Sequence, residues 1–192
     1  MTNFEFKARL HDAEQVRSVM QQRNAEVVSV MLQTDTYFHA PQGRLKLREI
    51  AFEPLAGKQN PPPRAELIFY QRADEASVKR SDYLIAPVSE SERMSEVLAA
   101  TLGVCVVVKK RRELYLLGYR NTPHAPPLPH IRVHLDQVET LGSFVEVEAV
   151  VGEGIAVELA QAEAQNLLAQ FGVAAEDLMH GSYSDLLEEA KR

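Results

Sequence analysis

Charged and apolar residues alternate with period two in several short stretches of the chain. The clearest stretch covers residues 44–48, where Arg44, Lys46 and Arg48 alternate with two leucines. In a β-strand, successive side chains leave opposite faces. The three basic residues would therefore share one face and the leucines the other. An ordinary surface strand also has this pattern. Only recurrence of the pattern in other strands would indicate a shared ionic face.

The same alternation recurs in other stretches, with both signs of charge. The further polar positions in this phase are Asn3, Glu5, Lys7, Arg64, Glu66, Arg72, Lys110, Arg112, Arg132, His134, Asp136, Glu146 and Glu148. Burying so many charges is costly unless they pair, hydrate or bind a ligand. A solvated outer face would explain any one strand equally well, but repetition across most strands favours one shared polar interior. We therefore predict a barrel or deeply curved sheet lined by charge.

Patterns of period two or 3.6, bounded by turn residues, predict the elements of the fold. The expected strands are residues 3–10, 25–39, 44–52, 64–72, 79–87, 104–118, 130–137 and 143–151. The expected helices are residues 11–22, 90–102, 154–171 and 182–190. We expect turns at residues 41–43 and 74–77, Pro-rich loops at 53–63 and 123–129, and a capping box formed by Ser89 and Glu92. Seven or eight strands with outer helices give an α+β antiparallel barrel, in one domain of residues 1–192.

Composition and charge narrow the range of partners. The net charge of −6 argues against a general nucleic-acid binder, which usually has a basic excess. No apolar run is long enough to span a membrane, so we expect no membrane partner. The single cysteine, Cys105, cannot form an internal disulfide, and a cytoplasmic location is the simplest expectation. Cys105 lies in an apolar run, which favours a buried core residue over a nucleophile.

The mixture of charges on the ionic faces suits a polyphosphate together with a divalent cation. Guanidinium and ammonium groups neutralise phosphate oxygens, and carboxylates hold Mg²⁺ or Mn²⁺. Glu146 and Glu148, two positions apart on one strand, are candidates for the metal site. His134 is either a general base near Asp136 or, as we favour, a hydrogen-bonding residue of the wall.

Residues 3–7, Asn-Phe-Glu-Phe-Lys, resemble the Glu-x-Glu-x-Lys signature of the CYTH superfamily. That superfamily contains class IV adenylyl cyclases, thiamine triphosphatases and inorganic triphosphatases. Further stretches resemble it in family order, namely residues 33–38, 43–49, 65–68, 110–113, 134–139, 144–148 and 182–186. The resemblance covers nearly the whole chain and is closest to the class IV cyclase-like branch.

The resemblance implies a triphosphate tunnel, an eight-stranded antiparallel β-barrel that binds a triphosphate and Mg²⁺ or Mn²⁺ inside, with helices packed outside. It assigns the metal to Glu5, Asp136, Glu146 and Glu148. It assigns substrate binding to Lys46, Arg48, Arg72, Lys110, Arg112 and Arg132. It assigns catalysis to Lys7, Glu66 and Arg112. Asn3 departs from the signature, because a carbonyl oxygen replaces the first glutamate and one negative charge is lost.

The function implied is a metal-dependent enzyme acting on a nucleotide or other triphosphate. A class IV adenylyl cyclase-like enzyme would convert ATP to cyclic AMP and pyrophosphate. A triphosphatase would hydrolyse inorganic or thiamine triphosphate in the same kind of site. Because Asn3 replaces a glutamate, a non-catalytic polyphosphate- or nucleotide-binding protein is a third alternative. We expect no nucleic-acid partner. The sequence is compatible with a homodimer but does not determine the oligomeric state.

Overall fold

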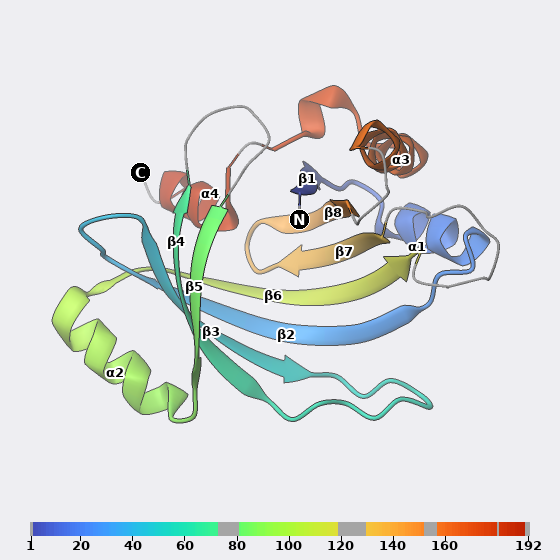
Figure 1. Ribbon diagram of the computed structural model, residues 1–192. Coiled ribbons are helices and arrows are strands. Elements are labelled where there is room, and N and C mark those ends of the chain that lie inside the picture. Colours follow the sequence, from blue (N-terminus) through green and yellow to red (C-terminus); the bar gives the residue numbers. More distant parts are fainter. Residues whose placement is uncertain (1, 73–80, 119–129, 152–156, 180, 191–192) are drawn as a thin grey trace. The chain divides into compact units, whose positions relative to one another are not determined.

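The computed structural model describes residues 2–72, 81–118, 130–151, 157–179 and 181–190 (Figure 1). The strands are β1 (Thr2–Arg9), β2 (Val27–Phe38), β3 (Arg44–Phe52), β4 (Arg64–Arg72), β5 (Ser81–Val88), β6 (Val104–Leu117), β7 (His130–Val138) and β8 (Gly142–Val151). The helices are α1 (Ala13–Gln22), α2 (Ser91–Leu102), α3 (Val157–Gln170), the 3₁₀ turn η1 (Ala175–Asp177) and α4 (Tyr183–Glu189). The turn expected at residues 74–77 and the loop expected at 123–129 lie outside the described residues.

The eight strands form one antiparallel sheet in the order β1-β8-β7-β6-β2-β3-β4-β5. This confirms the predicted α+β class and its eight strands. In the part of the chain that the structure describes, no helix is both long and apolar enough to cross a membrane.

The turn between β2 and β3 depends on Gly43. Its φ of +62° lies in the left-handed region, and a Cβ atom there would lie 2.8 Å from the Tyr70 carbonyl oxygen. Only glycine meets both conditions without strain. The resulting hairpin places Asp35 opposite Arg48 and Tyr37 opposite Lys46, which sets the register of the ionic face described below.

The capping box expected from Ser89 and Glu92 is wrong. Helix α2 begins at Ser91, and its N-cap is Glu90, which makes no side-chain capping hydrogen bond. Strand β5 continues to Val88, so Ser89 lies in the link before the helix. The helix start is tied instead by Ser91, whose hydroxyl donates to a Glu49 carboxylate oxygen at 2.7 Å.

Contacts divide the chain into two compact units. Unit 1 comprises residues 1–29, 112–137 and 142–180, and unit 2 comprises residues 30–111, 138–141 and 181–192. Strands β2 and β6 therefore contribute to both units.

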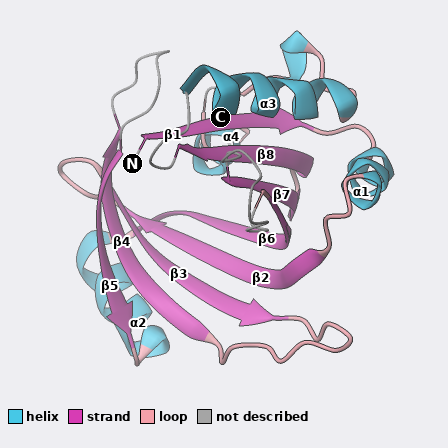
Figure 2. Ribbon diagram, turned by 45° about the vertical axis from the view of Figure 1, so that its right-hand side comes forward, coloured by secondary structure: helices cyan, strands magenta, loops and turns pink. Residues whose placement is uncertain are grey.

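In unit 1, helix α3 packs against β8 and β1 (Figure 2). The buried core of this unit consists of Ala8, Leu10, Val16, Val19, Met20, Tyr115, Ile131, Val133, Leu135, Val145, Val147, Ala149, Ala160, Ala164, Leu167, Leu168 and Phe171. The strand members of this core alternate with the charged positions, so the apolar face of the sheet lies under the helices and the ionic face is opposite.

Unit 2 repeats this plan with helix α2 beside β3 (Figure 1). Its core joins the buried residues Phe38, Leu47 and Ala65 to apolar side chains of α2, namely Met94, Leu98, Ala99 and Leu102. Lys46 and Arg48 flank Leu47 in the sequence, so they lie on the opposite face of β3. In each unit, a helix covers the apolar face and leaves the charges on the other one.

Candidate functional site

The ionic face of unit 1 brings together a set of residues that we call the carboxylate cluster. Its members are Glu5, Lys7, Arg112, His134, Asp136, Glu146 and Glu148. The antiparallel register of β1 and β8 sets Glu5 opposite Glu148 and Lys7 opposite Glu146. Cross-strand partners on one face have neighbouring side chains, so the alternation seen in the sequence becomes a contiguous charged surface here.

Arg112 is bound by two carboxylates at the centre of this cluster. Its Nε atom donates to Asp136 Oδ1 at 2.6 Å, and its Nη2 atom donates to Asp136 Oδ2 at 2.7 Å. The same Nη2 atom donates to Glu146 Oε2 at 2.7 Å. Asp136 has no exposed surface. The fork-shaped guanidinium therefore fixes the positions of both carboxylates, and Asp136 is engaged on both oxygens.

Lys7 lies between two glutamates of the cluster. Its Nζ atom is 3.4 Å from Glu5 Oε1 and 3.6 Å from Glu146 Oε2. Burial acts to lower the pKa of Lys7, but the negative charges of Glu146 and Glu5 outweigh it and raise that pKa. Lys7 therefore keeps its positive charge at neutral pH.

The two glutamates beside Lys7 are in opposite electrostatic situations. Burial acts to raise the pKa of Glu146, but Lys7 and Arg112 hold it well below its ordinary value. For Glu5, burial and repulsion by Glu146 together raise the pKa, despite the attraction of Lys7. The cluster thus contains more carboxylate charge than its own cations neutralise, and a divalent cation would relieve that repulsion.

Three groups of this cluster are spaced as metal ligands. One ligand atom each from His134, Glu146 and Glu148 lies within 4.8 Å of the others. His134 is only 6% exposed, and its Nδ1 atom has no hydrogen-bond partner among the described residues. Carboxylate oxygens suit Mg²⁺ and Mn²⁺, and imidazole suits transition metals. The residues present therefore fit the predicted divalent metal.

Arg132 lies at the edge of this cluster. Its Nη1 atom donates to Glu148 Oε2 at 3.4 Å, and its side chain is 48% exposed. Exposed ion pairs of this kind contribute little to stability.

The ionic face of unit 2 holds a second set, which we call the cation cluster. Its members are Asp35, Tyr37, Lys46, Arg48, Tyr70, Lys110 and Tyr183. Asp35 is its centre, since Arg48 donates to Oδ1 from Nε at 2.7 Å and to Oδ2 from Nη2 at 2.6 Å. Lys46 donates to Oδ2 at 2.8 Å. Burial acts to raise the pKa of Asp35, but Arg48 and Lys46 hold it well below its ordinary value.

Aromatic rings surround the ammonium group of Lys46. Its Nζ atom lies 5.3 Å from the centre of the Tyr37 ring and 5.7 Å from that of Tyr70. Burial raises the pKa of Tyr70 to about 12, so the phenol stays neutral and able to donate a hydrogen bond. Lys110 lies 5.2 Å from the Tyr183 ring in the same way. Rings of this kind hold ammonium groups in place without neutralising them.

Arg44 ties the terminal helix to this face. It donates to the Ser182 hydroxyl at 2.7 Å, and its Nη2 atom lies 2.8 Å from Asp185 Oδ1. Ser182 and Asp185 cap the first turn of α4 reciprocally. This capping box begins helix α4 and thereby places Tyr183, its first residue, beside Lys110.

The remaining predicted residues are less central. Glu66 on β4 lies opposite Arg48, and Arg64 Nε donates to its Oε1 atom at 3.3 Å. Asn3 and Arg72 belong to β1 and β4, but their side chains lie outside the described part of the structure.

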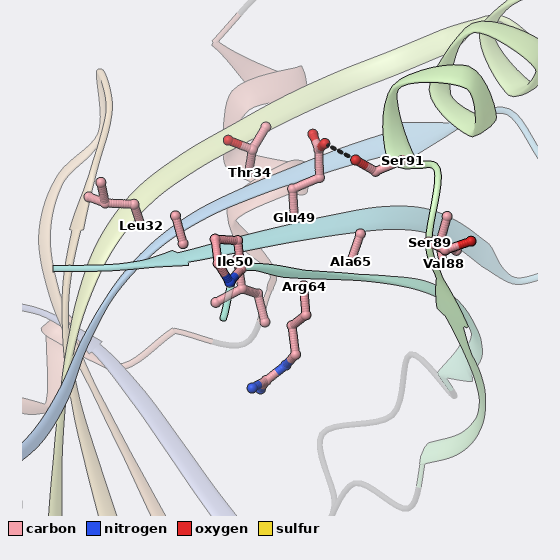
Figure 3. A pocket seen from close by; sticks show the side chains of 11 residues that line it. Leu32, Thr34, Glu49, Ile50, Arg64, Ala65, Val88, Ser89 and Ser91 are labelled. Carbon is pink, nitrogen blue, oxygen red and sulfur yellow. Dashed lines mark hydrogen bonds between the residues drawn. The ribbon is translucent and has the colours of Figure 1, made fainter. Parts of the chain in front are cut away.

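A pocket of about 330 Å³ lies elsewhere in unit 2, lined by residues of β2, β3, β4 and β5 and by the start of α2 (Figure 3). Figure 3 shows Glu49 and Ser91 directed toward one another and joined by their hydrogen bond. None of the predicted site residues is among the described residues that line this pocket. We therefore place the candidate site on the ionic faces and not here.

Sequence reasoning missed two residues that the structure makes central. Asp35 was part of the stretch 33–38 but was given no role, although a lone carboxylate in a strand rich in Val, Thr and Tyr already indicates a paired buried charge. His134 was assigned to the wall, because the sequence does not show that two glutamates of β8 face its ring.

The chain is thus an α+β protein with eight strands in one sheet, whose ionic faces carry one cluster rich in carboxylates and one rich in cations. The family model of the CYTH domain matches residues 1–183. The chain therefore belongs to the CYTH domain family, as the resemblance predicted.

Solved structures have the same fold. The PH1819 protein of Pyrococcus horikoshii OT3 is 22% identical, with a TM-score of 0.71, and the match covers 99% of each chain. A Vibrio parahaemolyticus protein proposed to be an adenylate cyclase is 18% identical, with a TM-score of 0.65, over 97% of this chain and 98% of that one. A Hippeastrum protein is 11% identical, with a TM-score of 0.57, and the match covers 100% of this chain and 97% of that one. It is also proposed to be an adenylyl cyclase and is described as having a dominant triphosphatase activity. A search of curated protein sequences gave no match.

Proposed function

We propose that the chain is a metal-dependent enzyme acting on a nucleotide or other triphosphate. The observation that supports this most is the pair of clusters with opposite excess charge, whose members range from buried to exposed. Lys46, Arg48 and Lys110 share a face with one central carboxylate, whereas Glu5, Glu146 and Glu148 share a face with few cations. Cations of this kind bind triphosphates, and carboxylates of this kind bind the divalent metal that accompanies them.

In this proposal, the cation cluster supplies the groups that bind phosphate oxygens. Lys46 and Lys110 are each 8% exposed, so their charges are poorly screened and act strongly on an anion. Asp35 and the tyrosines hold the cations in position, and positioned charges stabilise the transition state without reorganising.

The carboxylate cluster supplies the metal ligands, from Glu5, Glu146 and Glu148. The divalent ion, when bound, neutralises charge on the phosphate oxygens and on the leaving group. Arg112 keeps Asp136 and Glu146 in place through its three hydrogen bonds. Lys7 remains protonated and can donate to an oxygen that gains charge during the reaction.

Two reactions fit these groups. In the cyclase-like reaction, which we put first, the ribose 3′-oxygen attacks the α-phosphorus of ATP and pyrophosphate leaves. In the triphosphatase reaction, water attacks the terminal phosphorus and orthophosphate leaves. The proposed activity of the Vibrio parahaemolyticus relative favours the first, and the described activity of the Hippeastrum relative favours the second.

The test is incubation with ATP, inorganic triphosphate and thiamine triphosphate, each with Mg²⁺ and with Mn²⁺. Cyclic AMP with pyrophosphate would establish the cyclase, and orthophosphate would establish the triphosphatase. Binding of a triphosphate without any product would contradict the enzyme and leave a binding protein. A matched control is Glu158→Gln, an exposed substitution on α3, which should leave every activity unchanged.

A further inference from the structure

The ring of His134 faces two carboxylates at distances longer than a hydrogen bond. Its Nδ1 atom lies 3.9 Å from Glu146 Oε2 and 3.8 Å from Glu148 Oε1. The residue is 6% exposed, and Nδ1 has no hydrogen-bond partner among the described residues. Buried polar atoms normally have a partner, so this nitrogen points to a ligand.

A direct ion pair would bring these groups closer. An imidazolium that donates to a carboxylate lies about 2.7–2.9 Å from the accepting oxygen. The observed distances from Nδ1 to Glu146 Oε2 and to Glu148 Oε1 are both about 1 Å longer. By contrast, two atoms that are each about 2.1 Å from one metal ion lie about 3.0–4.2 Å apart, depending on the angle between them. The two distances from Nδ1 to the glutamate oxygens fall in that range.

The rest of the cluster engages these groups to different degrees. Arg112 donates to one oxygen of Glu146 and engages both oxygens of Asp136, so Asp136 is less suited to bind metal than the glutamates. Arg132 contacts Glu148 through Oε2, whereas His134 is nearest to Oε1. The Glu146 oxygen nearest to the ring, Oε2, is the one that also accepts from Arg112, so Glu148 Oε1 is the less engaged of the two oxygens that face His134.

We propose that His134, through Nδ1, is a metal ligand together with Glu146 and Glu148, and that this nitrogen makes the site prefer Mn²⁺ or a similar first-row transition metal over Mg²⁺. The inference rests on the proposed function, because it specifies the metal of the same carboxylate cluster. Mg²⁺ takes oxygen ligands and retains water, whereas imidazole binds transition metals more strongly.

The first test uses the wild-type protein without a histidine tag. Mn²⁺ is added at less than one equivalent, and pulsed electron paramagnetic resonance detects nitrogen coupled to the bound ion. The expected result is coupling from one imidazole nitrogen. Absence of nitrogen coupling on bound Mn²⁺, or absence of Mn²⁺ binding, would overturn the inference.

The second test compares metal affinities of variants by calorimetry. His134→Ala should weaken Mn²⁺ binding by at least about tenfold and Mg²⁺ binding by less than about threefold. His134→Asn, which offers an oxygen near the same position, should recover Mg²⁺ binding more than Mn²⁺ binding. Equal loss for both metals would overturn the inference.

The matched control is His11→Asn, since His11 also belongs to unit 1 but is exposed and paired with Asp177 at 2.8 Å. It should change neither affinity. If His134→Ala fails to fold, the inference is tested by the wild-type Mn²⁺ spectrum and by the metal affinities of His134→Asn. Turnover of a triphosphate without nitrogen coupling would contradict this inference alone, and nitrogen-coupled Mn²⁺ without turnover would contradict the proposed enzyme alone.

Discussion

The carboxylate cluster of unit 1 and the cation cluster of unit 2 are built on the same plan with the charges reversed. In unit 1, the guanidinium of Arg112 is bound by the carboxylates of Asp136 and Glu146. In unit 2, the carboxylate of Asp35 is bound by Lys46 and Arg48. In both units, these groups lie on the face of the strands opposite the helix-covered core.

The reversal indicates which groups are structural and which are available for a ligand. The group at the centre of each cluster, Arg112 or Asp35, is held by two neighbours of opposite charge, so it positions them. The majority charges keep capacity for a partner of opposite sign, and the raised pKa of Glu5 reflects burial and their repulsion. One cluster is therefore suited to a cation and the other to an anion.

The largest effect should come from removing the centre of the cation cluster. Asp35→Asn leaves Lys46 and Arg48 buried without their shared carboxylate, and breaking a buried ion pair costs about 3–5 kcal/mol. Urea unfolding measures the loss. The matched control is Glu53→Gln, which breaks a half-exposed pair with Arg111 and should cost less than about 1 kcal/mol. Equal losses in both variants would contradict the central role of Asp35.

Acid should remove the same stabilisation in the wild type. Because the folded pKa of Asp35 is lowered, its ion pairs stabilise the fold above the unfolded pKa of about 3.9 and lose that contribution as the pH falls through the folded value. The stability difference between wild type and Asp35→Asn should therefore be constant from about pH 7 to pH 5 and shrink below about pH 4. A difference that grows on acidification would contradict the assignment.

Lys46→Met should weaken triphosphate binding about 10- to 100-fold, the value of one or two hydrogen bonds to a charged group. The fold should persist, because Arg48 still pairs with Asp35 through two hydrogen bonds. Calorimetry with inorganic triphosphate measures the change. Lys109→Met, at an exposed position of β6, is the control. Unchanged affinity in Lys46→Met would remove this residue from the binding site.

Glu148→Gln should lower metal-dependent turnover about tenfold at limiting Mn²⁺, because the variant loses one charged ligand. Excess Mn²⁺ should restore part of the rate if the loss lies in metal affinity. Steady-state rates over a range of metal concentrations distinguish these effects. Retention of the full rate at limiting metal would exclude Glu148 from the ligand set.

The smallest effect should be a gain. Burial and repulsion by Glu146 raise the pKa of Glu5, so its charge opposes folding at neutral pH. Glu5→Gln should raise the free energy of unfolding by less than about 1 kcal/mol, since the residue is partly exposed, and the melting temperature should rise slightly. The same variant should bind metal more weakly. A loss of stability would contradict the repulsion between these carboxylates.

Local sequence patterns located the strands well, because period-two alternation and turn residues are local signals. The bounds of β3 and β4 agree with the predicted ranges, and Gly43 ends the expected turn. The capping box predicted at Ser89 was wrong. The helix begins at Ser91, whose hydroxyl donates to Glu49 on β3, and a contact between distant segments of this kind is not visible in the local sequence.

The site was predicted less completely, because its chemistry depends on the register between strands. Alternation placed Glu146 and Glu148 on an ionic face, but it could not show that the ring of His134 on β7 faces both of them. It also could not show that Asp136 would be engaged by Arg112 on both oxygens. Both facts follow only from the paired strands.

The most direct test of the account is turnover of triphosphates with Mn²⁺ by the wild type, Lys46→Met and Glu148→Gln measured in parallel. The account predicts product formation by the wild type, a loss that reflects weaker triphosphate binding in Lys46→Met, and a loss that depends on metal concentration in Glu148→Gln. Full activity in both variants would contradict it.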